Sequence, residues 1–182
     1  MNNNLSLNHF ITHSAHNLIK TGFKNAKNEI IWYLESLHVC TREQIYLDEM
    51  LLNNTLKNSI QKFCNQRMKG VPFQYILQKS TFYGRDFYIN KHTLIPRPET
   101  ELLVDQLKNH SFNNALEIGT GSGVLAITLS LEKIIKKIIA TDVSASALSV
   151  AKKNIDYFNL SSISLQLHDF LNQSFIKNIN NQ

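Results

Sequence analysis

Residues 115–123 read Ala-Leu-Glu-Ile-Gly-Thr-Gly-Ser-Gly, and this stretch does more than any other to decide the fold. An apolar run contains an acid, Glu117, and glycines then occupy every second position from 119 to 123. The next residues, 124–129, are Val-Leu-Ala-Ile-Thr-Leu and can begin a helix. Glycine is needed where the backbone takes positive φ or approaches a ligand closely. The order predicts a strand, a tight turn and a helix N-terminus, whose free N–H groups favour a small polar or anionic ligand.

The spacing of the glycines narrows the class of ligand. The dinucleotide fingerprint is Gly-x-Gly-x-x-Gly, but Val124 stands where its last glycine would fall, and Gly123 comes one residue early. A phosphate loop would end in Gly-Lys-Ser or Gly-Lys-Thr, which this turn lacks. Glu117, two residues before Gly119, would repel an anion. The pattern therefore favours a ligand with positive charge, such as the ammonium and sulfonium groups of S-adenosylmethionine.

Two later segments also lead to an acid at the end of an apolar run. Residues 137–143, Lys-Ile-Ile-Ala-Thr-Asp-Val, predict a buried strand with Asp142 at its carboxyl end. Residues 163–170 predict a third strand followed by Asp169 and Phe170. Ligands of parallel α/β sheets bind at the carboxyl ends of strands. We expect Asp142 to accept hydrogen bonds from ribose hydroxyls, and the last two residues to bond and stack on an adenine.

Each of these features also has a plainer explanation. A glycine turn is often only a tight connection between a strand and a helix, and an acid at a strand end often caps the following helix. Three such features at successive strand ends are harder to explain without a ligand.

Composition excludes several other classes of protein. The chain has 182 residues, 43% of them hydrophobic, and a net charge of +5. It contains no apolar run near the roughly 20 residues of a membrane span, and residues 1–4 lack the regions of a signal peptide. Cys40 and Cys64 have neither metal-ligand nor disulfide spacing, which favours a cytoplasmic protein. Because much of the positive charge is scattered lysine, we expect no specific nucleic-acid partner, and the lack of a long apolar run leads us to expect no membrane association.

The first part of the chain predicts a helical bundle. Residues 5–69 carry apolar positions at helical spacing. Thr41-Arg42-Glu43-Gln44 is a capping-box pattern that opens a short helix, and a further helix is expected from about Asn54 to Met68, ending before Gly70. His9, His13 and His16 share one helical face, a spacing that could bind a metal. No carboxylate or thiolate flanks them, so we expect no metal site.

The composition then changes. Residues 81–89 are aromatic and alternating, which predicts a hairpin. The segment 94–101, Leu-Ile-Pro-Arg-Pro-Glu-Thr-Glu, is rigid because proline fixes φ, and Pro98 suits the first position of a helix. From Glu99 onward helical and strand patterns alternate, as in a parallel sheet.

Three segments together resemble the PrmC/HemK family of protein-glutamine methyltransferases. They are residues 70–77 (Gly-Val-Pro-Phe-Gln-Tyr-Ile-Leu), residues 94–101 and residues 117–123. The resemblance covers nearly the whole chain. It implies an α/β fold in which an N-terminal helical bundle is joined by a β-hairpin to a partial class I, Rossmann-like, S-adenosylmethionine-dependent methyltransferase domain. The implied domains are a helical substrate-recognition domain, 1–78, a hairpin linker, 79–98, and the cofactor-binding half of the methyltransferase domain, 99–182.

The resemblance also implies a reaction and a site. Its substrate would be the glutamine of the Gly-Gly-Gln loop of peptide chain release factors, methylated on N5 by a monomeric enzyme during translation termination. The implied cofactor-binding residues are Glu117, Gly119, Thr120, Gly121, Ser122, Gly123, Asp142, Asp169 and Phe170. The glycines would line the methionine end, with Glu117 near its ammonium and Asp142 on the ribose. The residues implied to border the site are Arg97, Pro98, Glu99 and Thr100, for which a rigid linker and helix cap is an equal alternative.

One departure from the family pattern bears directly on catalysis. The family's catalytic signature, Asn-Pro-Pro-Tyr, does not occur in these 182 residues. In the family it accepts hydrogen bonds from the substrate amide, whose nitrogen is a poor nucleophile. A misplacement of about 1 Å can already cost roughly a hundredfold in rate. We therefore expect that the chain is C-terminally truncated, contains no catalytic residue and turns over little or not at all. A sheet cut after three strands is also expected to leave a pairing edge and a helix face uncovered.

Two other functions remain open from the sequence. An adenine- or cytosine-modifying nucleic-acid methyltransferase can share the same cofactor turn, although the Pro-Arg-Pro-Glu-Thr-Glu segment and the helical domain argue against it. A non-catalytic module could instead hold a release factor through residues 5–70 and bind no cofactor.

Overall fold

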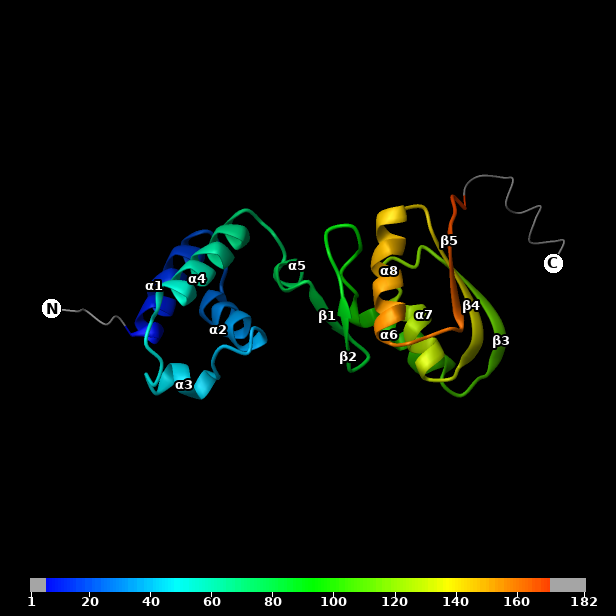
Figure 1. The fold of residues 1–182 in the computed structure, drawn as a ribbon, viewed down its shortest axis with the longest axis horizontal. Helices are drawn as coiled ribbons and strands as arrows, with labels where there is room; N and C mark the ends of the chain where they lie inside the picture. The colour runs from blue at the N-terminus through cyan, green and yellow to red at the C-terminus, as the bar shows by residue number, and fades with distance from the viewer. Residues whose placement is uncertain (1–5, 171–182) are drawn as a thin grey trace. The chain divides into compact units, whose positions relative to one another are not determined.

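The computed structural model describes residues 6–170, and the chain divides into two compact units, Met1–Leu77 and Gln78–Gln182. Figure 1 shows the first unit as helices, coloured blue to green-cyan, and the second as a mixture of strands and helices, coloured green to orange-red. By its contacts, the hairpin belongs to the second unit. The predicted division into 1–78, 79–98 and 99–182 by function stays a prediction.

The first unit is a bundle of helices around one apolar core. Its elements are α1 (Leu7–Lys20), α2 (Ala26–Ser36), α3 (Arg42–Tyr46), α4 (Asn54–Met68) and α5 (Phe73–Leu77). Residues at helical spacing on α1, α2 and α4, including Ile11, Ile30 and Phe63, are fully buried. The predicted capping box is confirmed: Gln44 N–H donates to Thr41 Oγ1, and Thr41 N–H donates to Gln44 Oε1. The predicted bounds of α4 are confirmed as well.

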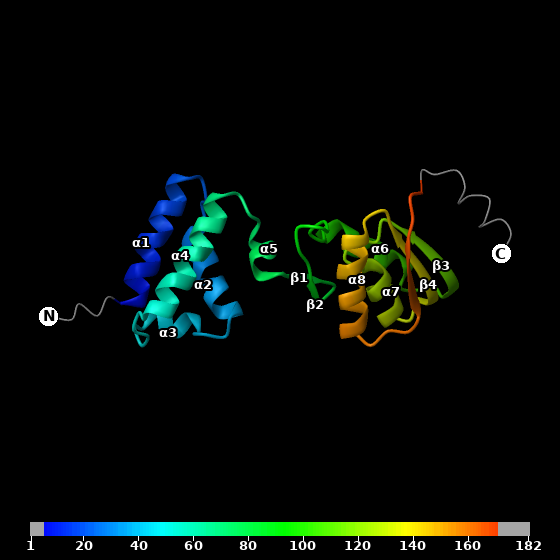
Figure 2. The ribbon, with the colours of Figure 1, turned by 45° about the horizontal axis from the view of Figure 1, so that its top comes forward.

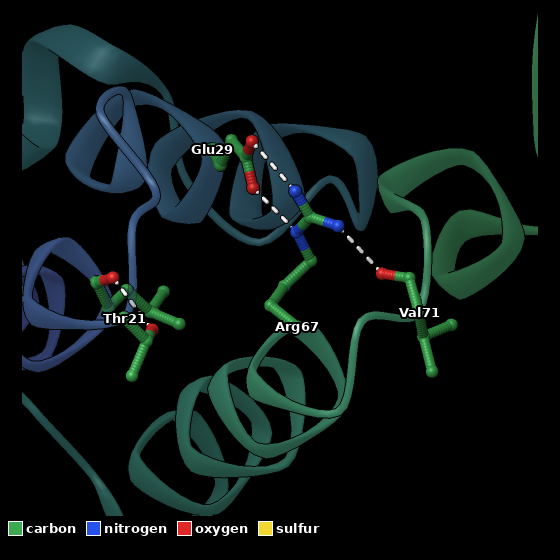
Figure 3. A network of polar contacts seen from close by, with 5 residues as sticks. Thr21, Glu29, Arg67 and Val71 are labelled. Carbon is green, nitrogen blue, oxygen red and sulfur yellow. Dashed lines mark hydrogen bonds and ion pairs between the residues drawn. The ribbon is translucent and has the colours of Figure 1, made fainter.

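A largely buried ion pair fixes the end of this bundle (Figure 3). Arg67, near the end of α4, donates from Nε and Nη2 to the Glu29 carboxylate of α2 at 2.7 and 3.1 Å. Its Nη1 donates to the Val71 carbonyl at 2.7 Å, and the guanidinium lies 4.5 Å from the centre of the Phe23 ring. One side chain therefore joins α2, α4 and the segment that enters α5.

The second unit combines a hairpin with a parallel sheet. Its elements are β1 (Lys79–Phe82), β2 (Arg85–Tyr88), α6 (Pro98–Leu107), β3 (Phe112–Ile118), α7 (Val124–Leu131), β4 (Ile135–Asp142), α8 (Ala145–Tyr157) and β5 (Ile163–Leu167). The hairpin turns at Tyr83 and Gly84, both at positive φ as a tight right-twisted hairpin requires. Strands β3, β4 and β5 are parallel and adjacent in that order, which confirms the predicted alternation.

Helices α6, α7 and α8 all lie on one face of this sheet (Figures 1 and 2). Val104, Ile127 and Ile155 from these helices share a buried core with the sheet, and the hairpin contributes Phe82 and Phe87 to it. The opposite face of the sheet exposes a row of apolar side chains, with Leu116, Ile118 and Ile139 at 40%, 50% and 37%. The predicted uncovered helix face is not contradicted, because α6 also exposes Leu102 and Leu103, at 59% and 47%.

Neither a metal-ligand cluster nor a membrane-spanning helix is present in the described residues, 6–170. Across residues 6–170, His, Cys, Asp and Glu side chains nowhere gather in threes that could hold a metal ion, and His9, His13 and His16 are exposed on α1. In the same range, every helix is too short or too polar to cross a membrane.

Candidate functional site

The parallel sheet brings its three strand ends to one edge. Ile118, at the end of β3, pairs with Thr141 of β4, and Asp142 pairs with Leu167 of β5. The chain after β5 is held there because His168 N–H donates to the Asp142 carbonyl at 2.9 Å. The glycine turn and the residues that follow β4 and β5 therefore lie along the same edge, as the sequence predicted.

The glycine turn is built on strand β4 next to it. Gly119, Gly121 and Gly123 have φ of +75°, +57° and +80°, in the left-handed region where glycine carries little strain. The N–H groups of Gly119 and Thr120 both donate to the Thr141 carbonyl, at 2.9 and 2.8 Å. The end of one strand therefore sets the conformation of the turn that follows its neighbour.

Two further N–H groups of the turn are also engaged within the protein. Gly121 N–H donates to Asp142 Oδ2 at 2.9 Å, and Gly123 N–H donates to the Thr120 carbonyl at 2.8 Å. An anion at this turn would need such donors. The sequence predicts free N–H groups at the helix N-terminus that follows the turn. The N–H groups of the turn itself, at residues 119, 120, 121 and 123, already have partners within the protein, which disfavours an anionic ligand there.

The three glycines differ in what surrounds them. A Cβ added at Gly123 would lie 3.2 Å from both the Ala151 Cβ and the Ile127 Cδ1, so this glycine lets α7 and α8 pack closely. A Cβ added at Gly119 or Gly121 would meet nothing within 4 Å. These two positions leave open space beside the backbone, which a ligand lying along the turn could occupy.

Glu117 lies two residues before Gly119, where the turn begins. Its Oε2 accepts a hydrogen bond from Thr120 Oγ1 at 2.7 Å. The pKa of Glu117 is raised to about 7, chiefly by burial and to a smaller extent by the nearby Asp142, while hydrogen bonds from the Thr120 hydroxyl and the Ala126 backbone oppose the shift. Within residues 6–170, Glu117 forms no ion pair. A poorly solvated carboxylate without a cation, next to an open turn, matches a positively charged ligand group.

Asp142 shapes the glycine turn, a role that the sequence did not predict. Its Oδ2 accepts from Gly121 N–H, and its Oδ1 accepts from Ser144 N–H at 2.9 Å. Ser144 in turn caps α8 by accepting from Ala147 N–H. Because each carboxylate oxygen has two lone pairs, these bonds leave acceptor capacity for hydroxyl groups. The ribose role of Asp142 stays a proposal, now combined with a role in shaping the turn.

The remaining predicted site residues lie on two other segments of the second unit. Asp169 and Phe170 follow β5 and are exposed. Arg97 is the N-cap of α6 and Pro98 its first residue, with Thr100 N–H donating to the Arg97 carbonyl at 3.0 Å. The segment thus starts α6, with Arg97 in the N-cap position but without a side-chain capping hydrogen bond, and both its capping role and its place beside the active site stay predictions.

Sequence reasoning missed two residues that shape the turn. Thr141 acts through its backbone carbonyl, which no side-chain pattern reveals. Asn154 on α8 donates to the Ser122 carbonyl at 2.8 Å and is itself 1% exposed. Its signal in the sequence was a polar residue inside the apolar stripe formed by Val150, Ala151 and Ile155.

Known proteins resemble both units of the chain. Residues 98–180 match the model of the methyltransferase small domain, and residues 9–77 match that of the PrmC N-terminal domain. A release factor glutamine methyltransferase of Mycoplasma mycoides is 34% identical over 181 residues, covering 96% of this chain and 56% of the relative. One of Chlorobaculum tepidum is 39% identical over 130 residues, covering 66% and 44%. A solved structure of M. capricolum TrmK with S-adenosylhomocysteine aligns over 41% of this chain and 34% of TrmK, with 27% identity and a TM-score of 0.36, too low to carry an argument.

The parallel sheet, the glycine turn and the two family models define a partial class I methyltransferase fold that follows a helical domain along the chain. The chain belongs to the PrmC/HemK family. It spans about half the length of the two curated relatives described above.

Proposed function

We propose that this chain binds S-adenosylmethionine at the glycine turn and contributes to N5-methylation of glutamine in peptide chain release factors. Curated relatives from several bacteria carry the name release factor glutamine methyltransferase, which supports the reaction and the substrate. The two buried free cysteines, Cys40 and Cys64, support a reducing cytoplasm as the compartment. The process served would be translation termination.

The observation that carries the proposal is Glu117 beside the open turn. Its carboxylate is partly shielded from water, has no cation partner among residues 6–170, and has a pKa of about 7. The methionine end of the cofactor brings an ammonium group that would complete this site. The space beside Gly119 and Gly121 leaves room for the ligand to lie against the backbone. The residues present therefore fit the cofactor.

The chemistry assigns different work to different residues. When bound, the cofactor supplies an electrophilic methyl group on sulfur. Glu117 would hold the ammonium, and Asp142 would accept hydrogen bonds from the ribose while keeping Gly121 in place. Asp169 and Phe170 would contact the adenine. Such fixed contacts help methyl transfer by placing the methyl group in line with the attacking nitrogen.

The helical unit would contribute recognition of the substrate. Residues 9–77, which match the PrmC N-terminal domain, form most of this unit. The Asn-Pro-Pro-Tyr signature that would hold the substrate amide is absent from the 182 residues. We therefore propose that this polypeptide by itself binds cofactor and release factor but transfers methyl groups very slowly.

Three assays on the purified 182-residue chain test the proposal. We expect calorimetry to detect micromolar binding of S-adenosylhomocysteine, and pull-down to detect a release factor. With labelled cofactor, methylation of that release factor should stay near background. A chain that bound the release factor but not S-adenosylhomocysteine would be a non-catalytic module, and one retained by nucleic acid instead would support a nucleic-acid methyltransferase. Turnover comparable to an intact enzyme would contradict the proposed need for Asn-Pro-Pro-Tyr.

A further inference from the structure

Helix α8 contains a polar residue at the centre of its buried face. Asn154 is 1% exposed and has Ala151 and Ile155, both buried, as neighbours on the same helix. Asparagine is a poor helix former, and a buried amide without partners is costly. An apolar residue of similar size would satisfy packing alone. The position therefore demands an explanation from the hydrogen bonds that the side chain makes.

Three hydrogen bonds connect Asn154 to two separate segments of the second unit. Its Nδ2 donates to the Ser122 carbonyl at 2.8 Å and to the Tyr88 carbonyl at 2.9 Å. Its Oδ1 accepts from Tyr88 N–H at 2.8 Å. Both backbone groups of Tyr88, the last residue of β2, are therefore bound by one side chain. The neighbouring Lys153 adds a cation–π contact to the Tyr88 ring, with Nζ 3.3 Å from its centre.

The bond to Ser122 affects more than one atom of the turn. A peptide group is planar, so fixing the Ser122 carbonyl also fixes the direction of Gly123 N–H. That N–H donates to the Thr120 carbonyl, and the Thr120 hydroxyl donates to Glu117. The chain of contacts thus runs from Asn154, through the Ser122–Gly123 peptide and Thr120, to the carboxylate at the candidate ligand site.

The bond to Tyr88 links the same asparagine to the hairpin. At the other end of the hairpin, Tyr83 N–H donates to Glu101 Oε1 at 2.8 Å, and Tyr83 Oη donates to Asp105 of α6 at 3.1 Å. The hairpin is thus attached to α8 at one end and, at the other, to the helix that begins with the Pro-Arg-Pro-Glu-Thr-Glu segment. Asn154 therefore connects the hairpin to the glycine turn.

We propose that Asn154 is a positioning residue that holds the glycine turn in its ligand-binding conformation and registers it against the hairpin. The predicted effect of Asn154 on cofactor affinity rests on the proposed function. The predicted effect of Asn154 on the Ser122–Gly123 peptide does not depend on any ligand. The residue does not touch the site, so its substitution weakens binding by letting the turn relax rather than by removing a contact.

The test compares two substitutions with a matched control. Asn154→Leu removes all three hydrogen bonds and keeps the number and branching of the side-chain heavy atoms, and Asn154→Asp keeps an acceptor for Tyr88 N–H but loses the amide donor to both carbonyls. Ile155→Ala, on the same helix, removes buried apolar volume but none of the hydrogen bonds to Tyr88 or Ser122. Affinity for S-adenosylhomocysteine is measured by calorimetry at a temperature where circular dichroism shows each variant folded. We expect both Asn154 variants to bind at least tenfold more weakly, and Ile155→Ala to bind within about twofold of the unchanged chain.

A second measurement requires no ligand. In ¹⁵N-labelled protein, hydrogen exchange at the Gly123 amide should accelerate at least tenfold in the Asn154 variants relative to amides of β4, and should keep its ratio to them in Ile155→Ala. If Asn154→Leu fails to fold, Asn154→Ser carries the same comparison. An unchanged exchange ratio together with unchanged affinity would overturn the inference. If the unchanged chain binds no S-adenosylhomocysteine, the proposed function fails, and the exchange ratio still decides the role of Asn154.

Discussion

The shifted pKa of Glu117 predicts that cofactor binding depends on pH in the neutral range. In the free protein this pKa is about 7, raised chiefly by burial and also by Asp142. A bound ammonium would stabilise the carboxylate and return its pKa toward the usual 4.5. Binding then requires an ionised Glu117, and the protein releases roughly half a proton when it binds in buffer near pH 7.

The size of the effect follows from the two pKa values. With a free-state pKa of about 7, roughly nine-tenths of Glu117 is ionised at pH 8 and roughly one-tenth at pH 6. We therefore expect the affinity for S-adenosylhomocysteine to fall about tenfold between pH 8 and pH 6, or about 1.4 kcal/mol. Calorimetry in two buffers of different ionisation enthalpy would measure both the affinity and the proton released.

Glu117→Gln is the matched control because it keeps the size and an acceptor for the Thr120 hydroxyl but cannot ionise. It should bind roughly 10- to 100-fold more weakly at pH 8, the usual loss for a hydrogen bond to a charged group. Any dependence on pH that remains in this variant belongs to the ligand or to other side chains. An unchanged chain whose affinity is the same at pH 6 and pH 8, or a Glu117→Gln variant with the full tenfold dependence, would refute the reasoning.

The same shift has a consequence for stability. The folded pKa of Glu117 lies above its unfolded value of 4.5, so the folded state holds the proton more tightly. Its contribution is therefore most favourable below pH 4.5 and is lost as the pH rises to about 7. Glu117→Gln should stabilise the second unit at pH 8 by up to about 3 kcal/mol, and by almost nothing at pH 4. Urea unfolding at the two pH values, followed by amide exchange in β4, would measure this difference; equal effects at both would contradict it.

The other predictions concern the glycines, Asp142 and Arg67. Gly123→Ala should lower the free energy of unfolding by about 2–3 kcal/mol, because of left-handed strain and the 3.2 Å contacts. Gly119→Ala should lower it by only about 1–2 kcal/mol but should reduce cofactor affinity more. Urea unfolding measures the stabilities and calorimetry the affinities, and an equal loss of stability in the two variants would contradict the packing difference. Asp142→Asn should destabilise the turn by about 1–3 kcal/mol because the amide offers one acceptor oxygen where the N–H groups of Gly121 and Ser144 need two, and amide exchange at both residues measures the loss. Arg67→Met should lower the free energy of unfolding of the helical unit by about 3 kcal/mol, because it leaves the largely buried Glu29 without its partner. The fluorescence of Trp32, the single tryptophan, would follow this unfolding. A loss no larger than in Lys69→Met would argue against the role of the Arg67–Glu29 ion pair.

The sequence predicted the order of elements well where local chemistry decides it. The capping box at Thr41, the bounds of α4 and the position of Pro98 depend on nearby residues, and all three are confirmed. The hairpin and the three parallel strands are confirmed for the same reason, since alternation and turn residues are local signals.

The use of hydrogen bonds at the turn could not be predicted in this way. The glycine pattern indicated a tight turn, but it did not indicate that Thr141 and Asp142 on the neighbouring strand accept hydrogen bonds from the N–H groups of Gly119, Thr120 and Gly121. Such partners depend on strand register, which a single sequence does not contain. Asn154 illustrates the same limit, because its two partner segments lie 66 and 32 residues away along the chain. The roles of Asp169, Phe170 and the segment 97–100 toward a ligand remain predictions.

The central claim is that the edge formed by Glu117, the glycine turn and Asp142 holds S-adenosylmethionine. The most direct test is a titration of the ¹⁵N-labelled chain with S-adenosylhomocysteine at pH 8, followed by amide resonances. We expect saturable shifts with a micromolar dissociation constant, concentrated at residues 117–123 and 142–144 and absent from the helices of residues 7–68. Shifts that do not saturate, or that fall mainly outside this edge, would contradict the claim.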